Sequence, residues 1–111
     1  MHYSYIILAA AIVLETIGTT ALQASHQFSR LVPSIIVVVA YAFSFYLLAM
    51  ALKFIPVGIA YAIWSGLGIV SIAIIGLLVF GQKLDLPAVI GMAMILSGIL
   101  VVHLFSNTAP H

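Results

Sequence analysis

Glu15 is the residue whose type and position point most directly to chemistry. It is the only charged residue between Met1 and Arg30, and it lies near the middle of an apolar run long enough to cross a bilayer. An acid at that depth costs about 2.5–3.5 kcal/mol on insertion scales, and no Lys or Arg lies within an apolar run to pair with it. Such a group is stable either with a bound proton or, when ionised, with a cation beside it.

These two states predict that a proton and a cation compete for Glu15, with proton exchange near neutral pH. That competition is enough to couple the entry of protons to the exit of cations, provided that the site faces one side of the membrane at a time. The alternative is a permanently protonated Glu15 that hydrogen-bonds a neighbouring helix.

The residues around Glu15 favour an organic cation over a metal ion. On a helix, the face that carries Glu15 continues at three- and four-residue spacing through Leu8, Ala11, Ile12, Gly18, Thr19 and Leu22. Ala11 and Gly18 are small, so we expect them to leave space beside the carboxylate. A hard metal ion needs several oxygen ligands, and this face offers only Thr19. We therefore expect neither a bound metal nor a cofactor.

Four aromatic residues lie inside two later apolar runs: Tyr41, Phe45, Tyr61 and Trp64. The faces of Trp and Tyr attract cations within about 6 Å of the ring centre. One carboxylate among aromatic walls suits lipophilic, quaternary ammonium or aromatic cations. Taken singly, an aromatic residue in such a run more often faces lipid or packs on another helix than contacts a ligand.

The amino-acid composition indicates whether the protein folds in water or in lipid. The chain has 111 residues, of which 66% are hydrophobic and 5% charged, whereas about 25% of an ordinary soluble domain is charged. Five charges cannot keep such a chain in water: Glu15, Arg30, Lys53, Lys83 and Asp85. The absence of a basic run argues against nucleic-acid binding, and the absence of cysteine excludes disulfides. The sequence therefore predicts a protein of the lipid bilayer.

The charges also divide the chain into elements. A membrane-spanning helix needs about 20 predominantly apolar residues. The stretches that carry no charge, or Glu15 alone, predict four helices, near residues 3–22, 32–52, 57–80 and 86–105. Because the connections are short, we expect residues 1–111 to form a single all-α transmembrane domain. Local signals agree: Pro33 suits a first helical turn, Gly81 a helix end, and Asp85 the N-cap of the last helix.

Membrane orientation is weakly specified. Four helices put Lys53 on one side and both Arg30 and Lys83 on the other, and positive charge in short loops sets which side stays cytoplasmic. This balance permits insertion in both orientations, and with it an antiparallel dimer. A single, weakly specified orientation is the alternative.

Small residues in the last two predicted helices suggest movement and assembly. Gly66 and Gly68 lie in mid-helix, where a glycine pair is typical of a hinge or, equally, of close packing. The last helix carries small residues that suit a dimer seam, with two larger ones between them: Gly91, Ser97 and Gly98, with Met94 and Ile95. One four-helix unit is too small to enclose and seal a sizeable pocket, so we expect a dimer.

Three stretches of the chain resemble the small multidrug resistance family, whose members are proton-coupled exporters of the bacterial inner membrane. The stretches are 15–20, ETIGTT; 56–66, PVGIAYAIWSG; and 80–85, FGQKLD. The second is highly specific, and the resemblance covers essentially the whole chain. It is strongest toward the quaternary ammonium exporters of the family.

The resemblance implies a multi-pass transporter rather than an enzyme. It implies an antiparallel, dual-topology homodimer in which both copies of Glu15 form one site for protons and lipophilic organic cations. It assigns substrate contacts to Trp64, Tyr61, Tyr41, Leu8, Ala11, Ile12, Gly18 and Thr19, and residue reasoning adds Phe45. It also assigns the bend to Gly66 and Gly68 and the dimer contact to Gly91 and Gly98.

One departure bears on the substrate. The guanidinium-exporting branch of the family has a tryptophan where this chain has Gly18, so we expect a wider pocket that favours bulky hydrophobic cations. Two rival functions stay open. One is export of guanidinium or polyamines, alone or as half of a heterodimer, and the other is a structural membrane subunit without transport.

Overall fold

The computed structural model describes residues 2–107, which form four helices. These are α1 (His2–Ala24), α2 (Leu31–Ala51), α3 (Val57–Val79) and α4 (Leu86–Phe105). All four are long and apolar enough to cross a membrane. The expected all-α, four-span fold is confirmed, and each helix begins and ends within two residues of its expected range.

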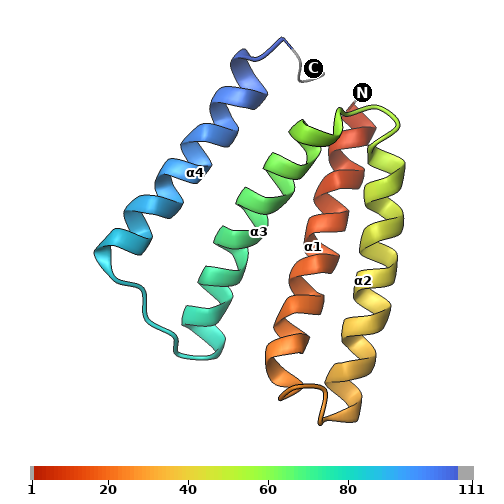
Figure 1. Cartoon of the computed structure of the whole chain (residues 1–111), viewed down its shortest axis with the longest axis vertical. Coiled ribbons are helices and arrows are strands. Elements are labelled where there is room, and N and C mark those ends of the chain that lie inside the picture. The colour runs from red at the N-terminus through yellow and green to blue at the C-terminus, as the bar shows by residue number, and fades with distance from the viewer. Residues whose placement is uncertain (1, 108–111) are drawn as a thin grey trace.

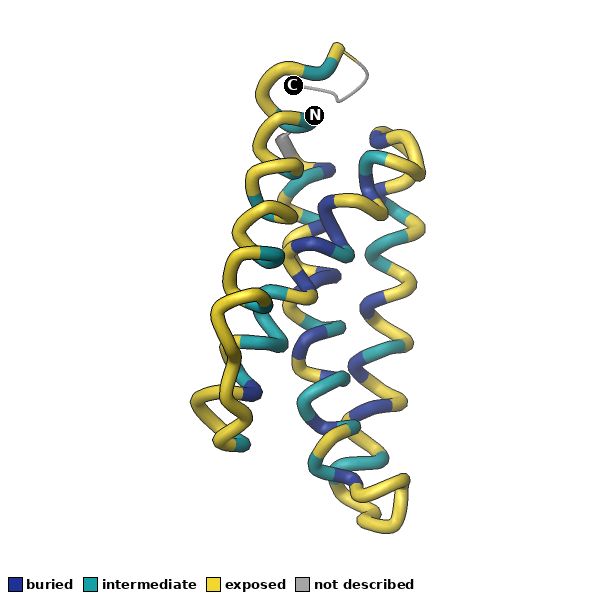
Figure 2. Tube along the Cα trace, turned by 60° about the vertical axis from the view of Figure 1, so that its left-hand side comes forward, coloured by how far each residue is buried: buried dark blue, intermediate teal, exposed yellow. Residues whose placement is uncertain are grey.

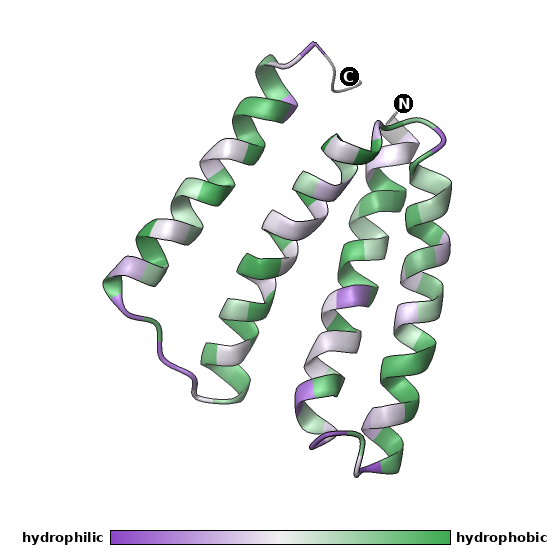
Figure 3. Ribbon diagram, viewed as in Figure 1, coloured by the Kyte–Doolittle hydropathy of each residue, from purple (hydrophilic) through white to green (hydrophobic). Residues whose placement is uncertain are grey.

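The helices run up and down beside one another, with α1 between α2 and α3 (Figure 1). The 25–30 and 80–85 connections lie at one end, and the 52–56 connection lies at the other. Polar residues gather at these connections, and one strongly hydrophilic position interrupts the middle of α1, where the sequence has Glu15 (Figure 3). Buried apolar residues of α1, α3, the end of α2 and the α2–α3 connection form the core: Leu8, Ala11, Ile12, Ala51, Ile55, Ala60, Ile63 and Trp64.

Helix α4 packs on α3 and contributes no buried residue to the core (Figure 2). Its contact with α3 is close at Gly66, where a Cβ atom would collide with the side chain of Ile99 and lie 3.0 Å from a methyl carbon of Ile95. The remaining surface of α4 is apolar and exposed, as lipid or a second protein chain requires.

Two helix ends follow the sequence signals. The Asp85 carboxylate accepts a hydrogen bond from the Ala88 backbone N–H at 3.0 Å and so caps α4. Gly81 has a φ of +69°, a left-handed conformation that glycine adopts without steric cost, and it follows the last residue of α3 by two positions. Both expectations are confirmed.

The connection between α1 and α2 is strained in a way that the sequence does not announce. Three consecutive residues without glycine have positive φ, His26 at 48°, Gln27 at 61° and Phe28 at 64°. Each left-handed residue costs about 1–2 kcal/mol. Ser25 holds the turn together, because its buried hydroxyl donates to the Leu22 carbonyl at 2.7 Å and accepts from the Phe28 N–H at 3.1 Å.

Candidate functional site

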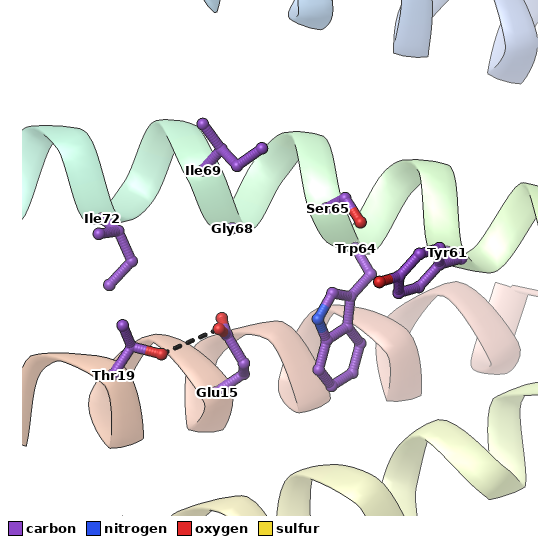
Figure 4. Close-up of a pocket in the computed structure, with 8 residues that line it drawn as sticks. All are labelled: Glu15, Thr19, Tyr61, Trp64, Ser65, Gly68, Ile69 and Ile72. Carbon is purple, nitrogen blue, oxygen red and sulfur yellow. Dashed lines mark hydrogen bonds between the residues drawn. The ribbon is translucent and has the colours of Figure 1, made fainter. Parts of the chain in front are cut away.

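A cavity of about 340 Å³ lies between α1 and α3 and contains Glu15 (Figure 4). Helix α1 contributes an acid and a hydroxyl, and α3 contributes two aromatic rings with small and aliphatic residues. The lining residues are Glu15, Thr19, Tyr61, Trp64, Ser65, Gly68, Ile69 and Ile72. The structure therefore brings together four of the predicted site residues, Glu15, Thr19, Tyr61 and Trp64, and adds Gly68 to them.

The two oxygens of the Glu15 carboxyl have different surroundings. Oε1 accepts a hydrogen bond from the Thr19 hydroxyl at 2.9 Å. Oε2 is buried and has no hydrogen-bond partner among residues 2–107. A buried oxygen without a partner costs about 1–3 kcal/mol, and more when it is charged. Oε2 is therefore the atom that a proton or a cationic ligand would satisfy.

Tyr41 extends this arrangement from α2. Its hydroxyl lies 2.6 Å from the Thr19 hydroxyl. Because a threonine hydroxyl has one hydrogen, and that of Thr19 is donated to Glu15, the Tyr41 hydroxyl must donate to Thr19. The result is a directed chain of hydrogen bonds, Tyr41 to Thr19 to Glu15, which stabilises negative charge on Oε1. Tyr41 thus acts on the carboxyl through Thr19 and is not itself part of the cavity lining.

Gly68 supplies the room beside the carboxyl group. A Cβ atom at this position would lie 3.3 Å from Oε2 of Glu15, closer than nine in ten real contacts of such an atom, so one of the two would have to shift. The missing side chain lets α3 pass Glu15 while Oε2 still faces the cavity. The sequence predicted Gly68 as part of a hinge, and its contact with Glu15 was not foreseen.

The aromatic residues form a wall with graded exposure. Trp64 is 9% exposed and Tyr61 is 64% exposed, and both line the cavity. The ring of Phe45 stacks on Trp64 with centroids 6.2 Å apart, and Tyr41 meets Phe45 edge-on at 6.4 Å. Phe45 therefore supports Trp64 from behind rather than lining the cavity.

Three other predicted contact residues are buried between the helices of this chain. Leu8, Ala11 and Ile12 are buried, and Leu8 and Ile12 line a separate apolar cavity of about 280 Å³ between α1, α3 and α4. The carbonyl of Ala11 accepts a hydrogen bond from the buried Ser44 hydroxyl of α2 at 2.8 Å. Direct substrate contact by these three residues stays a prediction.

The expectation that Ala11 and Gly18 leave space beside the carboxylate is wrong for the described chain. A Cβ atom at Gly18 would lie 2.6 Å from two ring carbons of Tyr41, so the aromatic ring fills that space. Ala11 is fully covered. The physical reason is the tight packing of α2 on α1, which also brings the Tyr41 hydroxyl to Thr19. Gly18 therefore does not widen the cavity.

We expect Gly18→Ala to destabilise the protein and to disturb the site together. The added methyl group must push the Tyr41 ring away and break its hydrogen bond to Thr19, and overpacking of this kind costs about 1–3 kcal/mol. Thermal unfolding in detergent measures the effect. Gly58→Ala is the matched control, because a Cβ atom there meets nothing within 4 Å. Equal melting temperatures for the two variants would contradict the packing described.

The predicted hinge glycines are packed against other residues, whereas most of the predicted dimer residues are exposed. Helix α3 runs through Gly66 and Gly68 without interruption, and both glycines make close contacts, so the hinge stays a prediction. On α4, Gly91 and Gly98 face open space and Met94 is 69% exposed, whereas Ile95 partly packs on Gly66. A dimer seam on this face is also a prediction.

Sequence reasoning missed Ser65, Ile69 and Ile72 as lining residues. They lie at helical spacing from Tyr61, so the same three- and four-residue rule that outlined α1 could have found them on α3. Within residues 2–107, no group of three or more His, Asp or Glu side chains is arranged to hold a metal ion.

The fold and the site define a small four-span membrane protein with one buried carboxyl facing an aromatic cavity. Residues 3–95 match the Small Multidrug Resistance protein family, and the chain belongs to it. The family is one of membrane transporters, and with four membrane-spanning helices the chain is a multi-pass protein of the bacterial inner membrane.

Named relatives resemble the chain over nearly its whole length. Multidrug transporter EmrE of Escherichia coli (strain K12) is 52% identical over 107 residues, which cover 96% of this chain and 97% of the relative. Quaternary ammonium compound-resistance protein QacF of Klebsiella aerogenes is 54% identical over 108 residues, covering 97% and 98%. A guanidinium exporter of Yersinia pseudotuberculosis is 46% identical over 103 residues, covering 93% and 99%.

Proposed function

We propose that this protein is a proton-coupled multidrug antiporter, which exports lipophilic, quaternary ammonium-type cations in exchange for protons. The observation that carries the proposal is the buried, unpartnered Oε2 of Glu15 at the edge of an aromatic cavity. The names of the relatives support it, since one is a multidrug transporter and another a quaternary ammonium compound-resistance protein. Neither substrate binding nor proton transfer requires a catalytic residue, so the proposal includes no enzymatic activity.

The exchange follows from the two states of one carboxyl group. Without a ligand, Oε2 is satisfied by a proton, which leaves the cavity neutral. When a monovalent organic cation enters, its charge stabilises the carboxylate and its apolar groups lie against Trp64 and Tyr61. The O–H bond of the carboxyl then breaks and one proton leaves for each such cation bound at that group. The Thr19 and Tyr41 hydroxyls hold Oε1 while Oε2 changes partner.

The functional unit in this proposal is an antiparallel homodimer. Tyr61 is largely exposed in the single chain, although it lines the cavity, and α4 has no buried residue. A second copy would cover such surfaces, and the nearly balanced positive charge of the connections permits the opposite orientation. Two Glu15 carboxyls would then lie in one enclosed site.

Export of guanidinium is the second candidate, and two observations favour it. A guanidinium exporter is 46% identical to this chain, and the ring of Tyr41 occupies the space that Gly18 was expected to leave open. A smaller, planar cation would suit a narrower cavity. Uptake of tetraphenylphosphonium and of guanidinium into proteoliposomes that contain only this protein would separate the two candidates.

Proton release on ligand binding tests the proposal directly. We expect tetraphenylphosphonium, added to weakly buffered, detergent-solubilised protein, to release protons at a pH where Glu15 is protonated and to release none where it is already ionised. Sodium chloride at the same concentration is the control. Binding of tetraphenylphosphonium without proton release at every pH tested from acid to alkaline would overturn the coupling.

A further inference from the structure

Three cavities follow one another from Glu15 to one end of the bundle. The Glu15 cavity shares Thr19 and Ile72 with a second one of about 50 Å³. The second shares Thr19 and Gln23 with a third one of about 400 Å³, which His26 and Gln27 also line. This row ends at the end of the bundle that carries the 25–30 and 80–85 connections (Figure 1).

Between Glu15 and the helix end, uncharged polar side chains stand among the apolar residues that line this row. On α1, Thr19, Thr20 and Gln23 follow one another toward the helix end, and Gln82 faces them from the α3–α4 connection. Their hydroxyl and amide oxygens can replace part of the water around a cation without the full attraction of a carboxylate.

The middle cavity is the constriction. The Gln82 side chain folds over Gly76, where a Cβ atom would lie 2.8 Å from the amide oxygen of Gln82. The Gln82 backbone N–H also donates to the Gly76 carbonyl at 2.9 Å, which holds the connection in place. A space of about 50 Å³ accommodates water but not a drug-sized cation.

We propose that this row of cavities is the route by which protons and organic cations pass between Glu15 and the water at this end of the bundle. Thr20 and Gln23 line the route, and the Gln82 side chain closes it to large cations. The inference rests on the proposed transport function. In an antiparallel dimer, the two copies supply one such route toward each side of the membrane.

The chain contains no cysteine, so single-cysteine variants test the route without background. Thr20→Cys places a thiol in the constriction. Ile74→Cys is the matched control, because Ile74 lies at a comparable distance from the same end of its helix and is 51% exposed outside the three cavities. The probe is a trimethylammonium-ethyl methanethiosulfonate, which reacts with thiols that water reaches and is itself a quaternary ammonium ion.

We expect the thiol of Thr20→Cys to react at least about tenfold faster than that of Ile74→Cys, because thiol exchange depends on access to the thiolate. Modification should abolish tetraphenylphosphonium transport in Thr20→Cys and leave it intact in Ile74→Cys. Equal rates of reaction, or transport that survives modification of Thr20→Cys, would overturn the route. If Thr20→Cys does not fold, Gln23→Cys gives the same comparison.

A separate measurement distinguishes failure of the route from failure of transport itself. Unmodified wild-type protein that releases protons on tetraphenylphosphonium binding retains the proposed function, whatever the cysteine variants do. The Gln82→Ala variant tests the constriction through binding kinetics. We expect tetraphenylphosphonium to associate and dissociate faster than in the wild type, while proton release persists. Unchanged rates in Gln82→Ala would show that this side chain does not close the route.

Discussion

Glu15→Gln is expected to abolish both proton release and proton-driven export. Glutamine keeps the size of the side chain and can still accept the Thr19 hydrogen bond, but its amide neither releases a proton nor carries a charge. Loss of the carboxylate also removes its attraction for the cation, so we expect tetraphenylphosphonium binding to weaken by about 100-fold or more. Proton release from the solubilised protein and proton-driven export in proteoliposomes measure the two losses.

Asp85→Asn is the matched control for that experiment. Asp85 is the only other acidic residue of the chain, and asparagine preserves the cap that it forms on α4. Proton release should persist in Asp85→Asn and disappear in Glu15→Gln. Proton-coupled export that continued in Glu15→Gln would refute the assignment of the site, because no other acid lies within a membrane-spanning helix.

Trp64→Ala is expected to weaken binding of aromatic cations strongly while leaving Glu15 able to bind a proton. Trp64 is buried, lines the cavity and stacks on Phe45. Its removal therefore takes a desolvated aromatic face away from the cavity. A desolvated cation–π contact contributes about 2 kcal/mol, which corresponds to a roughly 30-fold rise in Kd. Calorimetric titration with tetraphenylphosphonium measures it.

Two further variants separate an aromatic contact from a general loss of structure. Trp64→Phe keeps an aromatic face and should retain most of the affinity. Tyr46→Ala removes an aromatic ring of α2 that is 65% exposed and lies outside the Glu15 cavity, so it should leave the Kd unchanged. An equal loss of affinity in Tyr46→Ala and Trp64→Ala would mean that Trp64 acts through the fold alone.

The spacing of charged residues was sufficient to predict the helices. Because lipid disfavours unpaired charges and a helix satisfies its own backbone hydrogen bonds, each long apolar stretch had one stable conformation. Two helix ends were also predictable, because the Asp85 cap and the left-handed Gly81 depend only on residues close to them in the sequence. The left-handed residues His26, Gln27 and Phe28 could not be predicted, since none of them is glycine and the buried Ser25 holds them.

The same contrast applies to the site. An isolated acid in an apolar run depends on the solvent alone, so the sequence by itself determined that Glu15 needs a proton or a cation. Which glycine makes room for it depends on how helices pack. Tertiary structure decided that Gly68 of α3 faces the carboxyl while Gly18 is filled by Tyr41, because helical periodicity defines the faces of a helix but not which neighbour each face meets.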